Sequence, residues 1–236
     1  MRRATAIVAC LLAGHTAAAG LFWALVNVPE SNVLMLGLSA ALVAAILVAL
    51  GWTQTTALLA WRPDVTLGAA ARRGLRAAPV FLVAAAVFAV VWWVTERADV
   101  WLADHAGEID AWLIATFEVT SAAWVHRALD VVLFLLRYAA GVSLGVALLG
   151  AGAREGWAGL LRVGWLRAGL SRRHLGLVGA AMTLLVFLPL QAAYWRPEAL
   201  PPNAAEVVFA ALKLGAIFLA ANVGWALVLW ADARQP

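Results

Sequence analysis

Six long apolar stretches constrain this chain more than any other feature of its sequence. A helix needs about 20 apolar residues to cross the roughly 30 Å hydrocarbon core of a bilayer. The stretches are continuous, whereas the strands of a membrane barrel alternate apolar and polar residues. We therefore predict an all-α fold, a polytopic membrane helix bundle that forms a single integral membrane domain over residues 1–236. Its six transmembrane helices are expected at residues 5–27, 33–61, 78–95, 129–150, 175–195 and 204–230.

The composition agrees with this class and narrows the partners. The chain is 65% hydrophobic and 13% charged, whereas soluble domains are about half apolar and about one quarter charged. Its basic residues are dispersed among the apolar stretches, so we expect membrane lipids and no nucleic acid as partners. The single cysteine, Cys10, excludes an intramolecular disulfide and any cysteine-based zinc or iron–sulfur site.

The distribution of basic residues predicts the orientation. Of the 17, 12 fall on one side of the expected topology, 3 on the other and 2 within spans. The positive-inside rule then places both termini in the cytoplasm. Sixteen arginines against one lysine, with abundant Ala and Gly, are typical of a GC-rich bacterial gene, so we expect a bacterial inner (plasma) membrane. We also expect the first helix to be retained, although Ala17–Ala19 resembles a signal-peptidase site.

The longer connections carry further predictions. Leu67–Ala78 and Glu155–Leu170 bear arginines and are roughly amphipathic, which predicts surface helices between spans two and three and between spans four and five. Pro79 is expected in the first turn of span three, where a helix tolerates proline. On the outer side, residues 109–126 predict an interfacial helix, an early start of span four or a structured loop that caps the bundle.

Two basic residues inside predicted spans give the strongest functional signal. Arg137 lies in span four, and Lys213, the only lysine, lies in span six. A charge at the centre of a membrane helix costs about 2.5–3.5 kcal/mol on insertion scales, so each base needs a partner. Asp130 precedes Arg137 by seven residues and Glu206 precedes Lys213 by seven, a gap of about 10 Å that is too long for a pair within one helix. If spans four and six are neighbours, crossed pairs Asp130–Lys213 and Glu206–Arg137 are expected.

Two interpretations of these charges stay open. The bases reach outward to lipid headgroups or form a structural ion pair, or they line a polar cavity, open to the outer leaflet, that holds a phosphate or carboxylate. The second interpretation predicts six ligand-binding residues: Arg137, Lys213, Asp130, Glu206, Tyr138 and Gln191. His15, within span one, is expected to be a hydrogen-bonded structural histidine or part of a proton relay.

The motifs of common enzymes are missing from the sequence. It has no Gly-rich phosphate loop, HExxH pair or nucleophile elbow, and its four histidines share no metal-ligand spacing. We therefore expect a non-catalytic membrane subunit or scaffold of a larger assembly, without metal or cofactor, whose surface helices contact protein partners. The alternative is binding or transport of a small anionic or lipidic solute. A third possibility is an enzyme acting on lipid through acids and a histidine near the outer side: Glu96, Glu118, His126 and Asp130.

Overall fold

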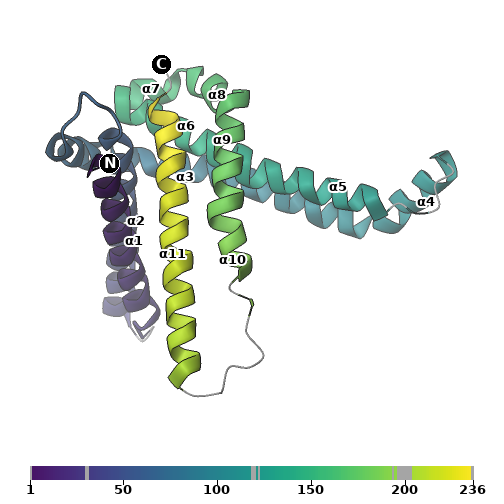
Figure 1. Ribbon diagram of the computed structural model, residues 1–236, viewed down its shortest axis with the longest axis horizontal. Coiled ribbons are helices and arrows are strands. Elements are labelled where there is room, and N and C mark those ends of the chain that lie inside the picture. Colours follow the sequence, from purple (N-terminus) through teal and green to yellow (C-terminus); the bar gives the residue numbers. More distant parts are fainter. Residues whose placement is uncertain are drawn as a thin grey trace.

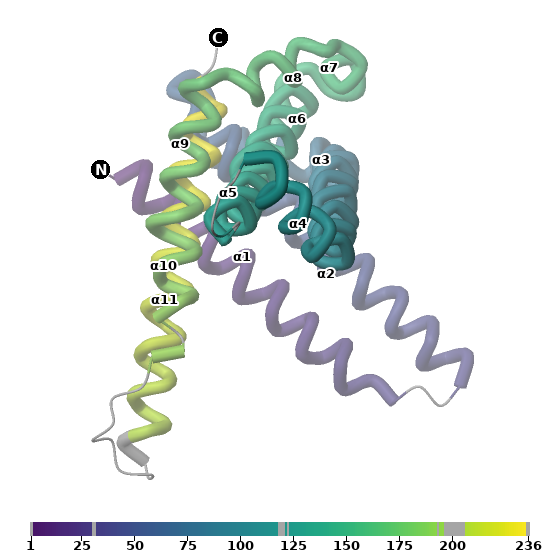
Figure 2. Tube along the Cα trace, turned by 90° about the vertical axis from the view of Figure 1, so that its right-hand side faces the viewer, coloured from purple at the N-terminus to yellow at the C-terminus, as the bar shows by residue number. Residues whose placement is uncertain are grey.

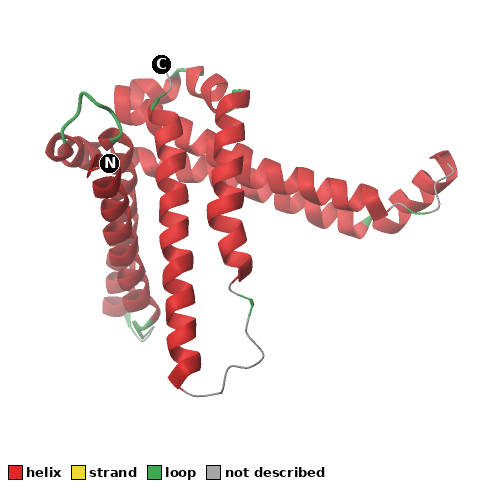
Figure 3. Ribbon diagram, viewed as in Figure 1, coloured by secondary structure: helices red, strands yellow, loops and turns green. Residues whose placement is uncertain are grey.

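The computed structural model describes residues 2–29, 32–117, 121, 123–192, 194–195 and 204–234, and these residues form helices and no strand (Figure 3). Within these ranges six helical segments are long and apolar enough to cross a membrane. The prediction of an all-α chain with six segments able to span a membrane is confirmed for the described residues. The segments are α1 (Arg2–Val26), α2 (Val33–Ala60), α3 (Leu67–Asp104), the run α5 (Ala123–Phe134), η1 (Leu135–Ala140) and α6 (Gly141–Glu155), the run α9 (Arg172–Met182), η2 (Thr183–Phe187) and α10 (Leu188–Ala192), and α11 (Ala204–Ala233).

The six segments form three helical hairpins that meet at one end (Figure 1). α1 pairs with α2, α3 with the α5–α6 run, and the α9–α10 run with α11. Away from the shared end the hairpins separate, as the diverging tubes of α1–α2 and α10–α11 show in Figure 2. Both termini lie near the shared end, together with two short helices, α7 (Trp157–Leu161) and α8 (Gly164–Gly169).

The packed core also lies at the shared end. Buried side chains come from the first half of α1, the last turns of α2 and the first half of α3. They continue through α6, the start of α9 and the last half of α11. The opposite halves expose large apolar residues, among them Leu34 and Leu36 of α2 and Leu212 of α11. The turn between α2 and α3 and the connection that contains α7 and α8 lie at this packed end together with both termini (Figure 1).

The connection at residues 67–78 differs from the prediction of a separate surface helix. It is the beginning of α3, which continues without interruption to Asp104 and contains Pro79 in its interior. A proline there removes one backbone hydrogen bond and clashes with the preceding turn. Side chains of α2 contact this part of α3, because Trp52 Nε1 donates to the Ala71 carbonyl at 2.9 Å and Thr55 Oγ1 lies 2.8 Å from the Gly74 carbonyl oxygen.

The second basic connection is helical, but as two short helices instead of one. α7 begins after Gly156, whose positive φ of 63° is a conformation that favours glycine. The chain then turns at Arg162 into α8. Trp157 and Leu161 remain exposed, as expected of apolar side chains on a segment that lies at a membrane surface.

On the predicted outer side, span three is longer than expected. α3 continues past Thr95 to Asp104, and a separate helix, α4 (Ala106–Phe117), follows. Span four begins at Ala123 instead of residue 129, so the early start and the additional helix both occur. His126 Nε2 lies 2.6 Å from Asp110 Oδ1 and joins α5 to α4. Glu118 lies outside the described residues.

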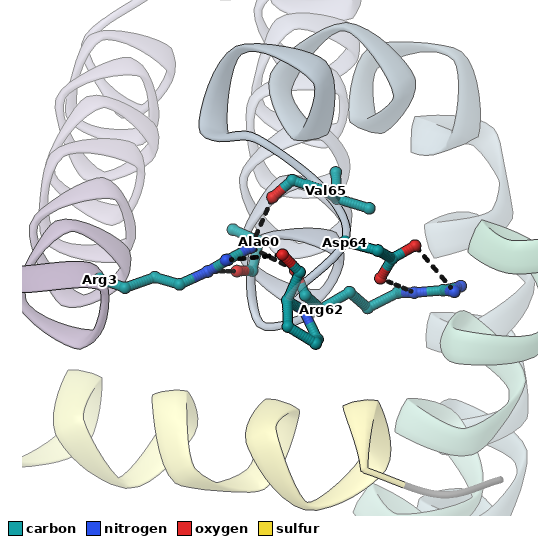
Figure 4. Close-up of polar contacts among 6 residues, drawn as sticks. Arg3, Ala60, Arg62, Asp64 and Val65 are labelled. Carbon is teal, nitrogen blue, oxygen red and sulfur yellow. Dashed lines mark hydrogen bonds and ion pairs between the residues drawn. The ribbon is translucent and has the colours of Figure 1, made fainter.

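Arg3 connects the first helix to the turn between α2 and α3 (Figure 4). Its Nε donates to the Ala60 carbonyl at 2.6 Å, and its Nη2 donates to the carbonyls of Arg62 and Val65. The last carbonyls of a helix have no partner within the helix, so a guanidinium is well suited to this position. A hydrogen bond from its own backbone amide and the neighbouring Arg62 guanidinium hold the pKa of the Asp64 carboxyl below its ordinary value.

Candidate functional site

Arg137 finds its acidic partners on α3. Its Nη2 lies 3.2 Å from Glu96 Oε2 and 3.9 Å from Asp99 Oδ2, and its Nε donates to Thr95 Oγ1 at 3.1 Å. These contacts correct the predicted pairing with Glu206. The physical reason is the length of α3, because the helix that continues past Thr95 carries both carboxylates alongside η1.

Aromatic rings surround this ion pair. The Arg137 guanidinium lies 4.9 Å from the centre of the Trp92 ring, a favourable cation–π distance. Tyr138 packs edge-on against Trp92 at 5.4 Å and against Phe187 at 4.3 Å. Arg137 and Tyr138 lie in the π-helical turn η1, and Phe187 lies in η2. Two π-helical turns therefore meet at Tyr138, and such turns occur frequently at functional sites.

The other predicted ligand-binding residues lie apart from this cluster. Lys213 Nζ donates to the Trp195 carbonyl at 2.9 Å and lies 5.4 Å from the centre of the Phe209 ring. Glu206 is half-buried in the first turn of α11, and the side chains of Asp130 and Gln191 are exposed. The structure thus brings together Arg137 and Tyr138, and places Lys213 in a different hairpin.

An apolar cavity lies where the three hairpins meet. Its volume is about 330 Å³, and its walls come from α2, α3, the η1–α6 run, α9 and α11. Small residues bring α3 and α6 close together at the cavity wall, since a Cβ at Gly145 would already lie 3.4 Å from the Ala84 carbonyl oxygen. Three side chains with polar atoms, Gln54, Tyr138 and Trp225, interrupt an otherwise apolar lining. An apolar pocket with a few polar groups is the usual form of a small-molecule site.

A chain of hydrogen bonds at one wall of the cavity joins α1, α2 and α11. Trp225 Nε1 donates to Gln54 Oε1, and Gln54 Nε2 lies 2.7 Å from His15 Nε2. His15 Nδ1 lies 2.7 Å from Asn222 Oδ1, and Asn222 Nδ2 donates to the Phe218 carbonyl at 2.8 Å. Sequence reasoning singled out His15 but missed Gln54 and Trp225 as its neighbours in this chain.

The donors and acceptors along this chain indicate which ring nitrogen of His15 carries the proton. An amide nitrogen only donates and an amide oxygen only accepts. His15 Nε2 must therefore accept from Gln54, and His15 Nδ1 must donate to Asn222. These two roles describe a neutral imidazole with its proton on Nδ1. The histidine is thus hydrogen-bonded at both ring nitrogens.

Neither a metal site nor a known relative identifies the cavity. Among the residues that the structure describes, no group of three or more His, Cys, Asp or Glu side chains is placed to hold a metal ion. No protein family, curated protein or solved structure matches this chain. The function must therefore be argued from the geometry of the sites themselves.

Proposed function

We propose that this chain is a membrane protein that binds a lipidic or other apolar small molecule within its helix bundle. The cavity of about 330 Å³ at the junction of the three hairpins carries this proposal. Gln54 on the cavity wall shows how far the cavity lies from the shared end of the bundle. It is six residues before the end of α2 at Ala60, or about 9 Å along the helix. An empty apolar cavity loses dispersion contacts along its walls, so an apolar occupant stabilises the bundle.

The charges near the cavity favour an apolar occupant over an anion. Glu96 and Asp99 both lie near the Arg137 guanidinium and leave it little net charge for a ligand. An anionic ligand would need Lys213 as a second base beside Arg137. Lys213 instead contacts Trp195 and Phe209, within its own hairpin. Gln54 and Trp225 are hydrogen-bonded to each other. The side chains that remain on the cavity wall are mostly apolar, and they match a hydrocarbon chain or ring.

A pair of adjacent alanines on α3 offers a matched test. Ala85 lines the cavity, whereas Ala86 is exposed and does not line it. We expect Ala85→Phe to fill the space and Ala86→Phe to leave it open. Native mass spectrometry of the gently extracted protein, followed by identification of released small molecules, measures the occupant. The wild-type protein and Ala86→Phe should retain a bound lipid that Ala85→Phe loses. Equal ligand content in both variants, with unchanged circular dichroism, would contradict the proposal.

A second candidate function is that of a non-catalytic subunit in a larger membrane assembly. The separated hairpins favour it, because their far halves expose large apolar side chains such as Leu36 (Figure 2). A photo-reactive amino acid at position 36 tests the idea in cells. Formation of a discrete protein adduct supports a subunit role, and labelling of lipid alone argues against it.

We place the chain in a bacterial inner membrane with its Arg-rich shared end in the cytoplasm. The proposal is supported by the burial pattern, which gathers both termini and the basic connections at one end, and by the positive-inside rule. Fusion of alkaline phosphatase or a fluorescent protein to Arg234 checks the orientation. Phosphatase activity without fluorescence at this position would overturn it.

A further inference from the structure

A second pocket, separate from the central cavity, lies at the shared end between α8, α9 and α11. Its volume is about 490 Å³, and none of its lining residues lines the central cavity. Three arginines line it: Arg167 of α8, Arg173 of α9 and Arg234, the residue that follows α11. Within the described part of the chain, no acidic side chain lies within ion-pair distance of these three. The pocket therefore gathers positive charge that no ion pair among the described residues neutralises.

His174, on the wall of this pocket, has a buried polar atom without a partner. The residue is 2% exposed. Ser143 Oγ donates to the Gly169 carbonyl at 2.6 Å and lies 2.8 Å from His174 Nδ1. Because the serine proton is used on Gly169, Ser143 must accept from Nδ1–H. His174 lines the pocket, and Nε2, at the opposite edge of the ring, is buried without a hydrogen-bond partner.

The backbone at the start of α9 adds partial positive charge to the same pocket. α9 is an 11-residue helix that begins at Arg172, and its N-cap, Ser171, lines the pocket. The first N–H groups of a helix point outward and carry partial positive charge, which favours an anion. Ser171 Oγ accepts from the backbone N–H of His174, so the N–H groups of Arg172 and Arg173 remain at the helix start. Guanidinium groups and helix N–H groups together are typical of phosphate recognition.

One side of the pocket is apolar, which bears on the kind of anion that would fit it. Leu177 and Trp230 line it next to the arginines, and the Arg234 guanidinium lies 4.6 Å from the centre of the Trp230 ring. Both residues belong to helices that are long and apolar enough to span a membrane. A group with a charged end and a hydrocarbon body matches this combination better than a fully hydrophilic anion does.

We infer that this pocket is a phosphate-binding site, formed by Arg167, Arg173, Arg234 and His174, for the headgroup of an anionic phospholipid or for free phosphate. The arginines pair with the phosphate oxygens, and His174 Nε2 accepts a hydrogen bond from the hydroxyl of a phosphomonoester such as phosphatidate or inorganic phosphate. The inference does not depend on the central cavity. Ala85→Phe, which fills that cavity, should leave phosphate binding unchanged, so the two proposals fail independently.

The test uses the full-length protein in neutral detergent and native mass spectrometry. The probes are dioleoyl phosphatidate, dioleoylglycerol, which has the same acyl chains without the phosphate, and inorganic phosphate. Arg173→Gln/Arg234→Gln removes two charges from the pocket. Arg2→Gln/Arg72→Gln removes the same charge from two exposed arginines that do not line this pocket. We expect the pocket variant to weaken phosphatidate binding about 100-fold, and the control variant about twofold or less.

A third variant examines the histidine. His174→Asn keeps an amide donor near the position of Nδ1 for Ser143 and removes Nε2, so binding should weaken about tenfold without loss of the fold. Phosphatidate binding that inorganic phosphate does not displace identifies a lipid headgroup, and displacement by inorganic phosphate identifies a free-phosphate site. Equal weakening in the pocket and control variants would overturn the inference, as would equal binding of dioleoylglycerol.

Discussion

The hydrogen-bond chain through His15 makes a quantitative prediction about stability. His15→Phe keeps an aromatic ring in place but removes two hydrogen bonds, one from Gln54 and one to Asn222. Gln54 and Asn222 are 4% and 2% exposed, so water does not replace the lost partner. Hydrogen bonds between membrane helices contribute about 0.6 kcal/mol on average and about 1.7 kcal/mol at most. Loss of two bonds should therefore destabilise the fold by about 1–3 kcal/mol.

A double-mutant cycle isolates the bond between α1 and α11. Asn222→Leu removes the acceptor of His15 Nδ1 together with the bond from Asn222 to the Phe218 carbonyl. The double variant loses the His15–Asn222 bond only once, so its loss of stability should be smaller than the sum of the single losses by about 0.6–1.7 kcal/mol. Unfolding by sodium dodecyl sulfate in mixed micelles, followed by circular dichroism, measures the three free energies of unfolding.

Two controls make the cycle decisive. His105→Phe changes a histidine whose Nδ1 contacts only the Trp101 carbonyl of its own helix, so its effect should stay within about 0.5 kcal/mol. If the His15 and Asn222 effects add to within about 0.3 kcal/mol, the two residues are not coupled. That result would refute the hydrogen-bond chain as a connection between helices.

Two further substitutions test contacts at the shared end. A Cβ at Gly150 would overlap the Asp232 carboxylate, which lies 3.2 Å from Arg154 Nη1. Gly150→Ala should therefore cost about 1–3 kcal/mol of stability, whereas Gly176→Ala meets no atom within 4 Å and should be neutral or slightly stabilising in a thermal melt. Arg3→Ala removes the side chain that binds the α2–α3 turn and should lower stability by about 1–2 kcal/mol. Arg2→Ala, at an exposed neighbour, should leave the melting temperature unchanged.

The number of spans could be predicted from the sequence because each apolar stretch is long enough by itself to require a helix. The ends of the helices could not. Span three ends at Thr95 when hydropathy alone is considered, yet α3 continues to Asp104. Hydropathy reports where a helix leaves the hydrocarbon and not where its hydrogen bonds stop. The first turns of α3 also contact donors from another helix, Trp52 and Thr55, which no local pattern reveals.

The polar chain through His15 was only partly visible in the sequence. Gln54 lies in the run Thr53-Gln54-Thr55-Thr56, which is unusual inside an apolar span and is a usable signal for a buried polar contact. Its connection to His15 crosses 39 residues, and that of His15 to Asn222 crosses 207. Contacts at such separations depend on which helices pack together, and one sequence does not give that information.

Arg137 illustrates how sequence spacing can assign the wrong partner to a buried charge. The cost of a charge in the membrane predicts correctly that a partner exists, but seven-residue spacing led to Glu206, whereas Glu96 and Asp99 stand beside it. Two carboxylates next to one guanidinium leave no surplus positive charge near the central cavity. Three arginines for which the described residues provide no ion pair, Arg167, Arg173 and Arg234, line the separate pocket between α8, α9 and α11 instead. We therefore assign the proposed phosphate site to that pocket and the proposed apolar ligand to the central cavity.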